Sequence, residues 1–277
     1  MTRKTDLSIL EPFLSLEQYE WADVVRFRDD VLALAEVPDA LDNLRLLRED
    51  LERCPCKALV FWSTEHSFSP ERCNVLLRNL GDLHKRNAIG DFTPGPLCGL
   101  TMMREENVFG GLIPWLRSVK RPVIMVFQGN VSLSFLGIGL ACDCRIATSD
   151  TTFYNQGRDY DMPSGAGLLY LLPAYIGLGR ATSLVTRATE VSAHSALKLG
   201  LLDEVAMSSE LDQAVQNISV EISRFSSGTL DTIKQLLNQR LPDFNTYLTI
   251  ETEGLDKALR GKPWEKLPDC GTKAASL

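Results

Sequence analysis

The clearest pattern along the chain is an alternation of short apolar runs with longer segments of helical periodicity. The run Val123–Phe127 is entirely apolar and rich in β-branched residues, which predicts a buried strand. The turn-forming residues Gln128–Asn130 follow, and then Leu133–Ala141 interleaves large apolar residues with glycine and alanine, which favours a closely packed helix. A second strand is predicted at Cys144–Ala147. This order places a helix start, with its unpaired amides, at a strand's carboxyl end, where an anion or oxyanion binds well.

The part of the chain before this stretch carries the same two kinds of pattern. Strand-like runs at Trp21–Arg28 and Val31–Val37 predict a hairpin around the charged residues between them. Leucines at three- and four-residue spacing predict a helix over Ala40–Arg53, and Lys57–Trp62 predicts another buried strand. The polar loop Ser63–Pro70 leaves that strand at its carboxyl end, which is where ligands bind in open α/β sheets.

Helical patterns dominate the remaining segments. The glycines and prolines of Asn87–Leu100 predict a long loop of the kind that forms a lid. Ser192 is predicted to cap a short helix that ends at Gly200, and Leu201–Val205 to form a strand. The other predicted helices are Leu76–Arg86, Glu105–Val119, Arg180–Ala188, Leu211–Phe225, Leu230–Arg240 and Tyr247–Arg260.

Composition and charge exclude several classes of protein. The chain has 277 residues, 44% of them hydrophobic and 23% charged, which is ordinary for a globular protein with a large core. No apolar run approaches the roughly 20 residues of a membrane helix, and the first residues lack the apolar region of a secretory signal. The net charge of −7 argues against a nucleic-acid binder. We therefore expect a cytoplasmic protein that binds neither membrane nor nucleic acid.

The cysteines and histidines do not form a metal-binding pattern. Seven cysteines are present, and neither Cys54–Cys56 nor Cys142–Cys144 has the two-residue gap of a zinc knuckle. The three histidines are widely spaced. The sequence therefore predicts no metal site, and it predicts reduced, mostly buried thiols.

The order of elements and several motifs resemble the crotonase (enoyl-CoA hydratase/isomerase) superfamily. The matching motifs are the PVI strand, the glycine-rich helix start, ACDCRIA at 141–147, PSGAG at 163–167, and the run from GLGRA to LLDEV at 177–205. The resemblance extends from about Asp23 to Trp264 and is strongest between Pro122 and Val205.

This resemblance implies an α/β fold, a crotonase-like spiral of ββα repeats, with C-terminal helices that form a homotrimer or hexamer. We accordingly expect a lead-in at residues 1–20, an α/β core at 21–205, a helical region at 206–265 and a tail at 266–277. The implied ligand is an acyl thioester of coenzyme A or of an acyl carrier protein, with no separate cofactor. Its carbonyl would lie between two backbone amides that stabilise an enolate.

The two oxyanion amides of the family fall on altered residues. One belongs to a triple-glycine turn that corresponds to Leu133–Phe135, so the amide of Ser134 would donate, unless Ser134 only caps the helix. The other falls on Pro70, which has no N–H to give. Either Ser69 or Glu71 donates in its place, or half of the oxyanion hole is missing.

The two catalytic glutamates of hydratases map to glycines, Gly137 and Gly157. Water addition needs paired carboxylates, so the resemblance predicts no ordinary enoyl hydration or dehydration. Asp159, Tyr160 and Asp161 lie just beyond the second position and are the candidate replacements. A desolvated carboxylate there would have a raised pKa and act as an acid or base; the alternative is a solvated acidic loop.

Other candidates are weaker. Tyr154 and Asn155 could hydrogen-bond an acyl oxygen or satisfy the loop backbone, and His66 could reach a thioester or lie in solvent. The remaining residues expected to line the acyl pocket are Leu133, Phe135, Gly137 and Gly157.

Other members of the superfamily also depart from the two-glutamate pattern. Met162–Pro173 resembles a run in polyketide-associated decarboxylases, and Gly261–Glu265 resembles the ending of companion dehydratases. Some naphthoate synthases likewise have glycine at the second glutamate position. Our first hypothesis is a lyase (decarboxylation or elimination) or isomerase that works by enolate stabilisation in specialised metabolism. The second is a catalytically silent relative that binds an acyl carrier or a protein partner.

Overall fold

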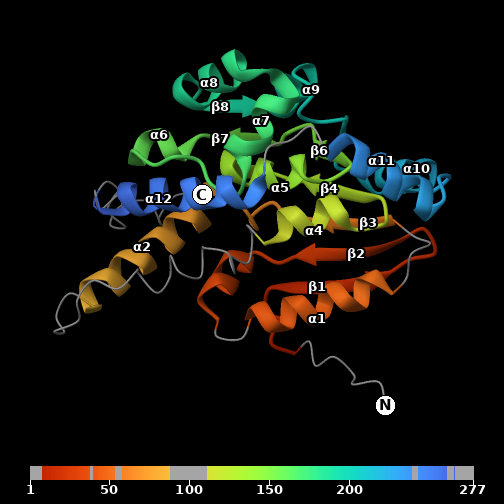
Figure 1. The fold of residues 1–277 in the computed structure, drawn as a ribbon, viewed down its shortest axis with the longest axis horizontal. Helices are drawn as coiled ribbons and strands as arrows, with labels where there is room; N and C mark the ends of the chain where they lie inside the picture. Colours follow the sequence, from red (N-terminus) through yellow and green to blue (C-terminus); the bar gives the residue numbers. More distant parts are fainter. Residues whose placement is uncertain are drawn as a thin grey trace.

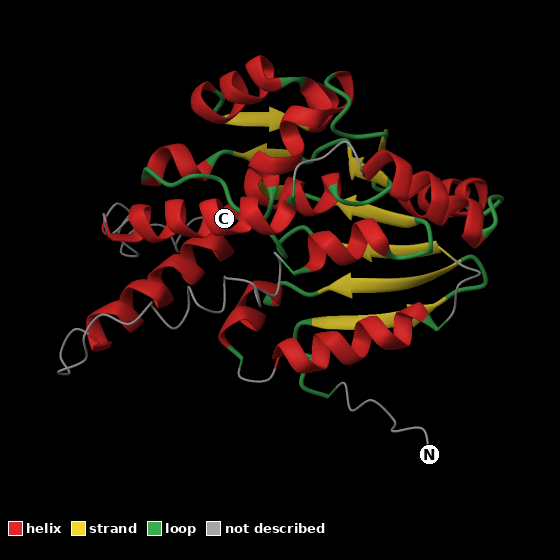
Figure 2. Cartoon of the chain, in the orientation of Figure 1, coloured by secondary structure: helices red, strands yellow, loops and turns green. Residues whose placement is uncertain are grey.

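A computed structural model of the chain describes residues 8–37, 40–53, 58–87, 111–238, 243–260 and 265. Within these ranges, a six-stranded sheet and a smaller three-stranded sheet are surrounded by helices (Figures 1 and 2). The large sheet has the order β1-β2-β3-β4-β6-β9, and only the β1–β2 pair is antiparallel. Its strands are β1 (Leu14–Gln18), β2 (Ala22–Phe27), β3 (Ala58–Trp62), β4 (Val123–Phe127), β6 (Cys144–Thr148) and β9 (Glu204–Ala206).

The small sheet has the order β5-β7-β8 and is built from short strands that follow those of the large sheet. Its strands are β5 (Asn130–Ser132), β7 (Thr152–Tyr154) and β8 (Glu190–Ser192). The chain thus passes from β4 to β5 and from β6 to β7, and each such pair is followed by helical turns. This succession agrees with the ββα repeats that the sequence resemblance implies.

Most helices lie where the sequence predicts them. Pro70 begins α2 six residues before the predicted start, because Ser69 caps the helix and proline suits the first helical position. Ser192 caps α9 as predicted, by accepting a hydrogen bond from the Ser195 amide. The helices are η1 (Val31–Glu36), α1 (Ala40–Glu52), α2 (Pro70–Asn87), α4 (Leu112–Ser118), η2 (Leu133–Phe135), α5 (Leu136–Leu140), α6 (Gln156–Tyr160), α7 (Leu168–Ile176), α8 (Leu178–Arg187), α9 (Ala193–Lys198), α10 (Leu211–Ile222), α11 (Ser227–Asn238) and α12 (Phe244–Arg260).

The predicted N-terminal hairpin is wrong in its second strand. β2 pairs instead with β1, which lies inside the predicted lead-in, so that Leu14 opposes Phe27. The segment after β2 forms the 3₁₀ helix η1, which buries Val31 and Leu34. Those residues are three apart and so lie on one side of a 3₁₀ helix. This spacing is hard to recognise in the sequence, because the residues between them are apolar too. β1 therefore adds residues 14–18 to the edge of the large sheet, with Leu14 buried.

Both faces of the large sheet are buried, as expected for parallel strands covered by helices. On one face, Val60, Ile124 and Ile146 pack against Leu211 and Val215 of α10. On the other face lies the larger apolar cluster, which extends to η2, α5 and α7. No helix within the described ranges is long and apolar enough to cross a membrane. Most of the predicted lid, the Cys54–Cys56 pair and the segment 261–264 lie outside the described residues.

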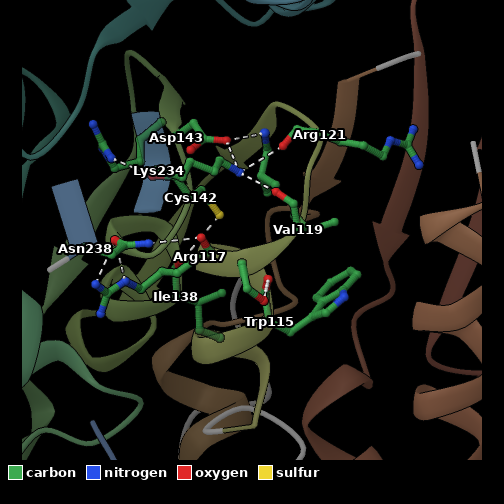
Figure 3. Close-up of polar contacts among 12 residues, drawn as sticks. Trp115, Arg117, Val119, Arg121, Ile138, Cys142, Asp143, Lys234 and Asn238 are labelled. Atoms are coloured by element: carbon green, nitrogen blue, oxygen red, sulfur yellow. Dashed lines mark hydrogen bonds and ion pairs between the residues drawn. The ribbon is translucent and has the colours of Figure 1, made fainter. Parts of the chain in front are cut away.

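Buried charges attach the C-terminal helices to this core. The Lys234 ammonium on α11 is 2.7 Å from the Asp143 carboxylate and donates to the carbonyls of Val119 and Arg121 (Figure 3). Asp143 Oδ2 also accepts the amide of Val123 at 2.8 Å. Only 6% of the Lys234 side chain is exposed, so this ion pair is shielded from water.

Candidate functional site

A pocket of about 140 Å³ opens where α2, η2, α6 and α12 come together. Its wall is mostly apolar. Its polar groups come from five separate elements, so the pocket depends on the whole spiral and on the C-terminal helix. They are Ser132, Ser134, Gln156, Tyr160 and Glu251, with the thiol of Cys73.

Helix α2 lines this pocket through Cys73, Leu76 and Leu77, and its first residues, which are outside the described lining, carry the predicted replacement donors. The Ser69 amide donates to the His66 carbonyl at 3.1 Å, and Ser69 Oγ accepts the Arg72 amide at 3.3 Å. Ser69 is therefore a helix cap whose own amide is engaged. Pro70 has no N–H, which leaves the amide of Glu71 as the first-turn donor that the helix does not satisfy. Of the two predicted replacement donors, the geometry favours Glu71.

The second helix start is the turn η2, and direct contacts hold it beside the first. The Ser132 amide donates to the Phe68 carbonyl at 2.7 Å, and the rings of Phe68 and Phe135 stack with centroids 4.6 Å apart. Ser134 is the second residue of η2 and lines the pocket with Phe135. First-turn amides have no partner inside their own helix, so the amide of Ser134 is placed to donate.

The two positions assigned to catalytic glutamates have no room for any side chain. A Cβ on Gly137 would lie 2.6 Å from the backbone nitrogen of Leu168 and closer still to the carbonyl of Ala166. A Cβ on Gly157 would lie 2.5 Å from the carbonyl oxygen of Met162. The backbone of residues 162–168 therefore occupies the space that these side chains would need.

The acidic candidates after Gly157 are only partly at the pocket. Tyr160 is buried and lines it. Asp159 and Asp161 are exposed on α6 and at its end, where Asp161 has a left-handed backbone with φ of 58°. Asp161 faces a separate hollow shared with Arg158 and is absent from the described lining of the pocket.

Four other sequence candidates lie away from the described pocket lining. Asn155 is committed to structure, since its side-chain amide donates to the carbonyls of Val185 and Ala188 at 2.8 and 3.0 Å. Leu133 is buried in the core, and Tyr154 is half-buried in β7. His66 is exposed on its loop.

Gln156 joins two walls of the pocket. Its side-chain nitrogen donates to the Pro70 carbonyl at 2.9 Å and to Asn74 Oδ1 at 3.0 Å, which ties α6 to the start of α2. Its side-chain oxygen is buried and has no hydrogen-bond partner among the described residues. A buried acceptor without a donor is costly, so a ligand that brings an N–H or O–H would be favoured here.

Glu251 is the functional candidate that sequence reasoning missed. It lines the pocket from α12, and its Oε1 accepts the phenol of Tyr247 and the amide of Gly167. Burial raises the pKa of the Glu251 carboxyl, although these two hydrogen bonds oppose the shift. A signal existed, because Glu251 follows Phe244, Tyr247 and Leu248 in the apolar stripe of the helix.

The rest of the pocket offers little charge. Among the described residues that line it, Glu251 is the only carboxylate, and none is lysine, arginine or histidine. Burial raises the pKa of the Cys73 thiol to about 12, so this cysteine stays protonated and is a poor nucleophile. No group of three or more potential metal ligands comes together within the described ranges.

The fold is that of the crotonase class of proteins. The sequence profile of the enoyl-CoA hydratase/isomerase family matches residues 105–259, and the chain belongs to this family. The crystal structure of an enoyl-CoA hydratase from Bacillus halodurans superposes with a TM-score of 0.70 at 17% identity, covering 92% of this chain and all of that one.

Two curated relatives each match about half of the chain. The short-chain-enoyl-CoA hydratase of Clostridium acetobutylicum is 29% identical over 139 residues, which are 50% of this chain and 53% of that protein. The trans-2-decenoyl-[acyl-carrier-protein] isomerase of Streptococcus mutans is 28% identical over 145 residues, 52% of this chain and 55% of that protein. The alignments thus span about half the length of these relatives.

Proposed function

We propose that this protein acts on an acyl thioester of coenzyme A or of an acyl carrier protein, as an isomerase or a lyase. The amides of Glu71 and Ser134 would hold the thioester oxygen and stabilise the enolate. The observation that carries the proposal is the apolar pocket, which Ser134 of η2 lines directly and which α2 lines one turn beyond its start, through Cys73, Leu76 and Leu77. Preorganised amides contribute about 3–4 kcal/mol each towards an oxyanion in such a site.

Hydration is the reaction that this site supports least. Adding water to an enoyl thioester needs one group to activate the water and one to deliver a proton. Gly137 and Gly157 carry neither, and the backbone of residues 162–168 fills both positions. An isomerisation or a decarboxylation needs the oxyanion hole and at most one proton-transfer group, which this pocket can supply.

We expect no hydration of crotonyl-CoA by the purified protein. The measurement is the loss of enoyl absorbance, with an established enoyl-CoA hydratase as the positive control. In parallel, mass spectrometry would follow a panel of acyl-CoA and acyl-carrier thioesters. Robust hydration would contradict the argument from the glycines. Binding of thioesters without any conversion would favour the second hypothesis, a silent binding protein, which the proline at position 70 also favours.

We also propose that the C-terminal helices assemble the protein into a trimer or hexamer. Leu236, Leu237 and Ile250 are 61%, 67% and 64% exposed on α11 and α12, an apolar surface that a second copy would cover. The resemblance of Met162–Pro173 to polyketide-associated decarboxylases supports a role in specialised metabolism, in the cytoplasm.

Leu236→Glu should dissociate this assembly, because it buries a charge in an apolar interface. Light scattering coupled to gel filtration should show a smaller particle than for the unmodified protein. Leu46→Glu is the matched control, since Leu46 is 42% exposed on α1, a helix that lies apart from α11 and α12 in Figure 1, and it should leave the mass unchanged. A monomeric unmodified protein would overturn the proposed assembly.

A further inference from the structure

One oxygen of the half-buried Glu251 carboxyl at the pocket accepts no hydrogen bond from the described residues. Both hydrogen bonds that Glu251 accepts, from the Tyr247 phenol and from the Gly167 amide at 3.3 Å, go to Oε1. Oε2 has no hydrogen-bond partner among the described residues. The two bonds to Oε1 fix the direction of the carboxyl and leave the other oxygen able to receive a proton.

The surroundings suit reversible proton transfer at this carboxyl. The apolar side chains of Leu76, Phe135, Met162 and Leu255 line the same pocket, which keeps water scarce. Burial raises the pKa of Glu251, which brings a carboxyl closer to the range where it both takes and returns a proton. The turn that Glu251 contacts through Gly167 is the one that closes the positions of Gly137 and Gly157.

We propose that Glu251 is the catalytic acid–base of this pocket, and that its substrate class is an uncharged enoyl thioester whose double bond it shifts. This inference rests on the proposed function and deepens it. A single carboxyl is sufficient, because an allylic shift removes one proton and returns one proton. The carboxyl comes from α12 and lies about 95 residues beyond the second glycine position in the sequence.

The charge of the pocket selects against the carboxylated substrates that a decarboxylase uses. No lysine, arginine or histidine is among the described residues of the lining, so none of these residues would neutralise a second carboxylate. Such a group would face Glu251 in an apolar cavity, where like charges repel strongly. The buried oxygen of Gln156 is likewise an acceptor and would not attract an anion.

The proposed step balances without any co-reactant. The carboxylate of Glu251 removes a proton from C2 of a 3-enoyl thioester, and the C–H electron pair forms the enolate held by the two amides. When the carbonyl re-forms, the C2=C3 bond forms and the C3=C4 bond breaks. C4 then takes the proton back from the Glu251 carboxylic acid. The product is the conjugated 2-enoyl thioester, and the carboxylate is regenerated.

The test uses the full-length protein with trans-3-hexenoyl thioesters of coenzyme A and of an acyl carrier protein, and follows formation of the conjugated product. We expect Glu251→Gln to lower kcat at least about 100-fold, the usual range for a lost acid–base group, while keeping the melting temperature and the affinity for hexanoyl-CoA. Glu251→Asp should recover part of the rate. Glu253→Gln, an exposed neighbour on the same helix, should behave as the unmodified protein.

The pH dependence of the isomerisation rate distinguishes a catalytic role of Glu251 from a merely structural one. The titratable groups that share the pocket with Glu251 are Tyr160 and Cys73, with Tyr247 behind it. The rate of the unmodified protein should rise as a carboxyl ionises, and the residual rate of Glu251→Gln should lack this rise. A merely structural role would leave the profile unchanged and would instead lower the melting temperature.

The outcomes distinguish this inference from the proposed function. Full activity of Glu251→Gln, or loss of activity only in Asp161→Asn, would overturn the role of Glu251 and leave the proposed function standing. Release of carbon dioxide from glutaconyl-CoA without any shift of hexenoyl thioesters would overturn the substrate class alone. No conversion of any thioester by the unmodified protein would overturn the proposed function itself.

Discussion

Replacing Gly137 with glutamate should unfold the site rather than create a hydratase. The new Cβ would meet the Leu168 nitrogen at 2.6 Å and the Ala166 carbonyl even more closely. These are backbone atoms that cannot move aside as a flexible side chain does. Even Gly137→Ala should cost about 1–3 kcal/mol of unfolding free energy, the usual range for overpacking, and the glutamate more.

The control for this prediction is a helical glycine with open space around it. A Cβ on Gly179 in α8 would have nothing within 4 Å, so Gly179→Ala should be neutral or stabilise by up to about 1 kcal/mol. Urea denaturation of the two alanine variants measures the difference directly. A folded Gly137→Glu protein that hydrates crotonyl-CoA would refute both the steric argument and the assignment of this position.

The second large effect is expected at the buried ion pair of α11. Lys234→Met keeps the aliphatic stem but removes the ammonium, which leaves the carbonyls of Val119 and Arg121 without this donor and the Asp143 carboxylate without its ion-pair partner. Breaking a buried pair from one side typically costs about 3–5 kcal/mol. Lys120→Met is the control, because Lys120 is 69% exposed and 3.4 Å from Asp231, and such pairs contribute about 0–1 kcal/mol.

The unfolding free energy lost in Lys234→Met should depend on pH, and the sign of this dependence follows from the pKa of Asp143. Burial raises the pKa of Asp143 in the folded protein, while Lys234 opposes the rise. A carboxyl with a raised folded-state pKa stabilises the fold below its unfolded pKa, and this contribution is lost as the pH rises through the folded value. Without Lys234 the pKa of Asp143 rises further. The loss of unfolding free energy in Lys234→Met should therefore be larger at neutral pH than at about pH 4.5. Adding Asp143→Asn should recover part of the stability; an equal deficit at both pH values would contradict the cause.

Where hydrophobic periodicity is strong, the sequence was enough to place the elements. Val123–Phe127 and Ala40–Glu52 are a strand and a helix as predicted, because each must bury one consistent set of apolar residues. The apolar run after Arg28 was predicted as a strand but forms a 3₁₀ helix. Its apolar residues are nearly continuous, and such a segment fits a strand and a 3₁₀ helix equally well.

The candidate site was harder to predict because its parts come from distant segments. Ser134, Phe135, Gly157 and Tyr160 do line one pocket, since they lie on consecutive turns of the spiral. Glu251 lies on a helix whose docking onto the 162–168 turn no local pattern encodes. Its place in an apolar stripe was visible, but only the tertiary structure shows that the stripe faces the pocket.

The turn at residues 162–168 has a consequence for how such a protein can change by single substitutions. Its backbone fills two positions at once, so neither Gly137 nor Gly157 can regain a side chain while the turn keeps this path. A substitution that adds a side chain at either glycine would therefore have to come together with a change in the path of this turn. Relatives with a side chain at either position should route this turn differently, and recovering a two-carboxylate site would require exchanging the loop as a block.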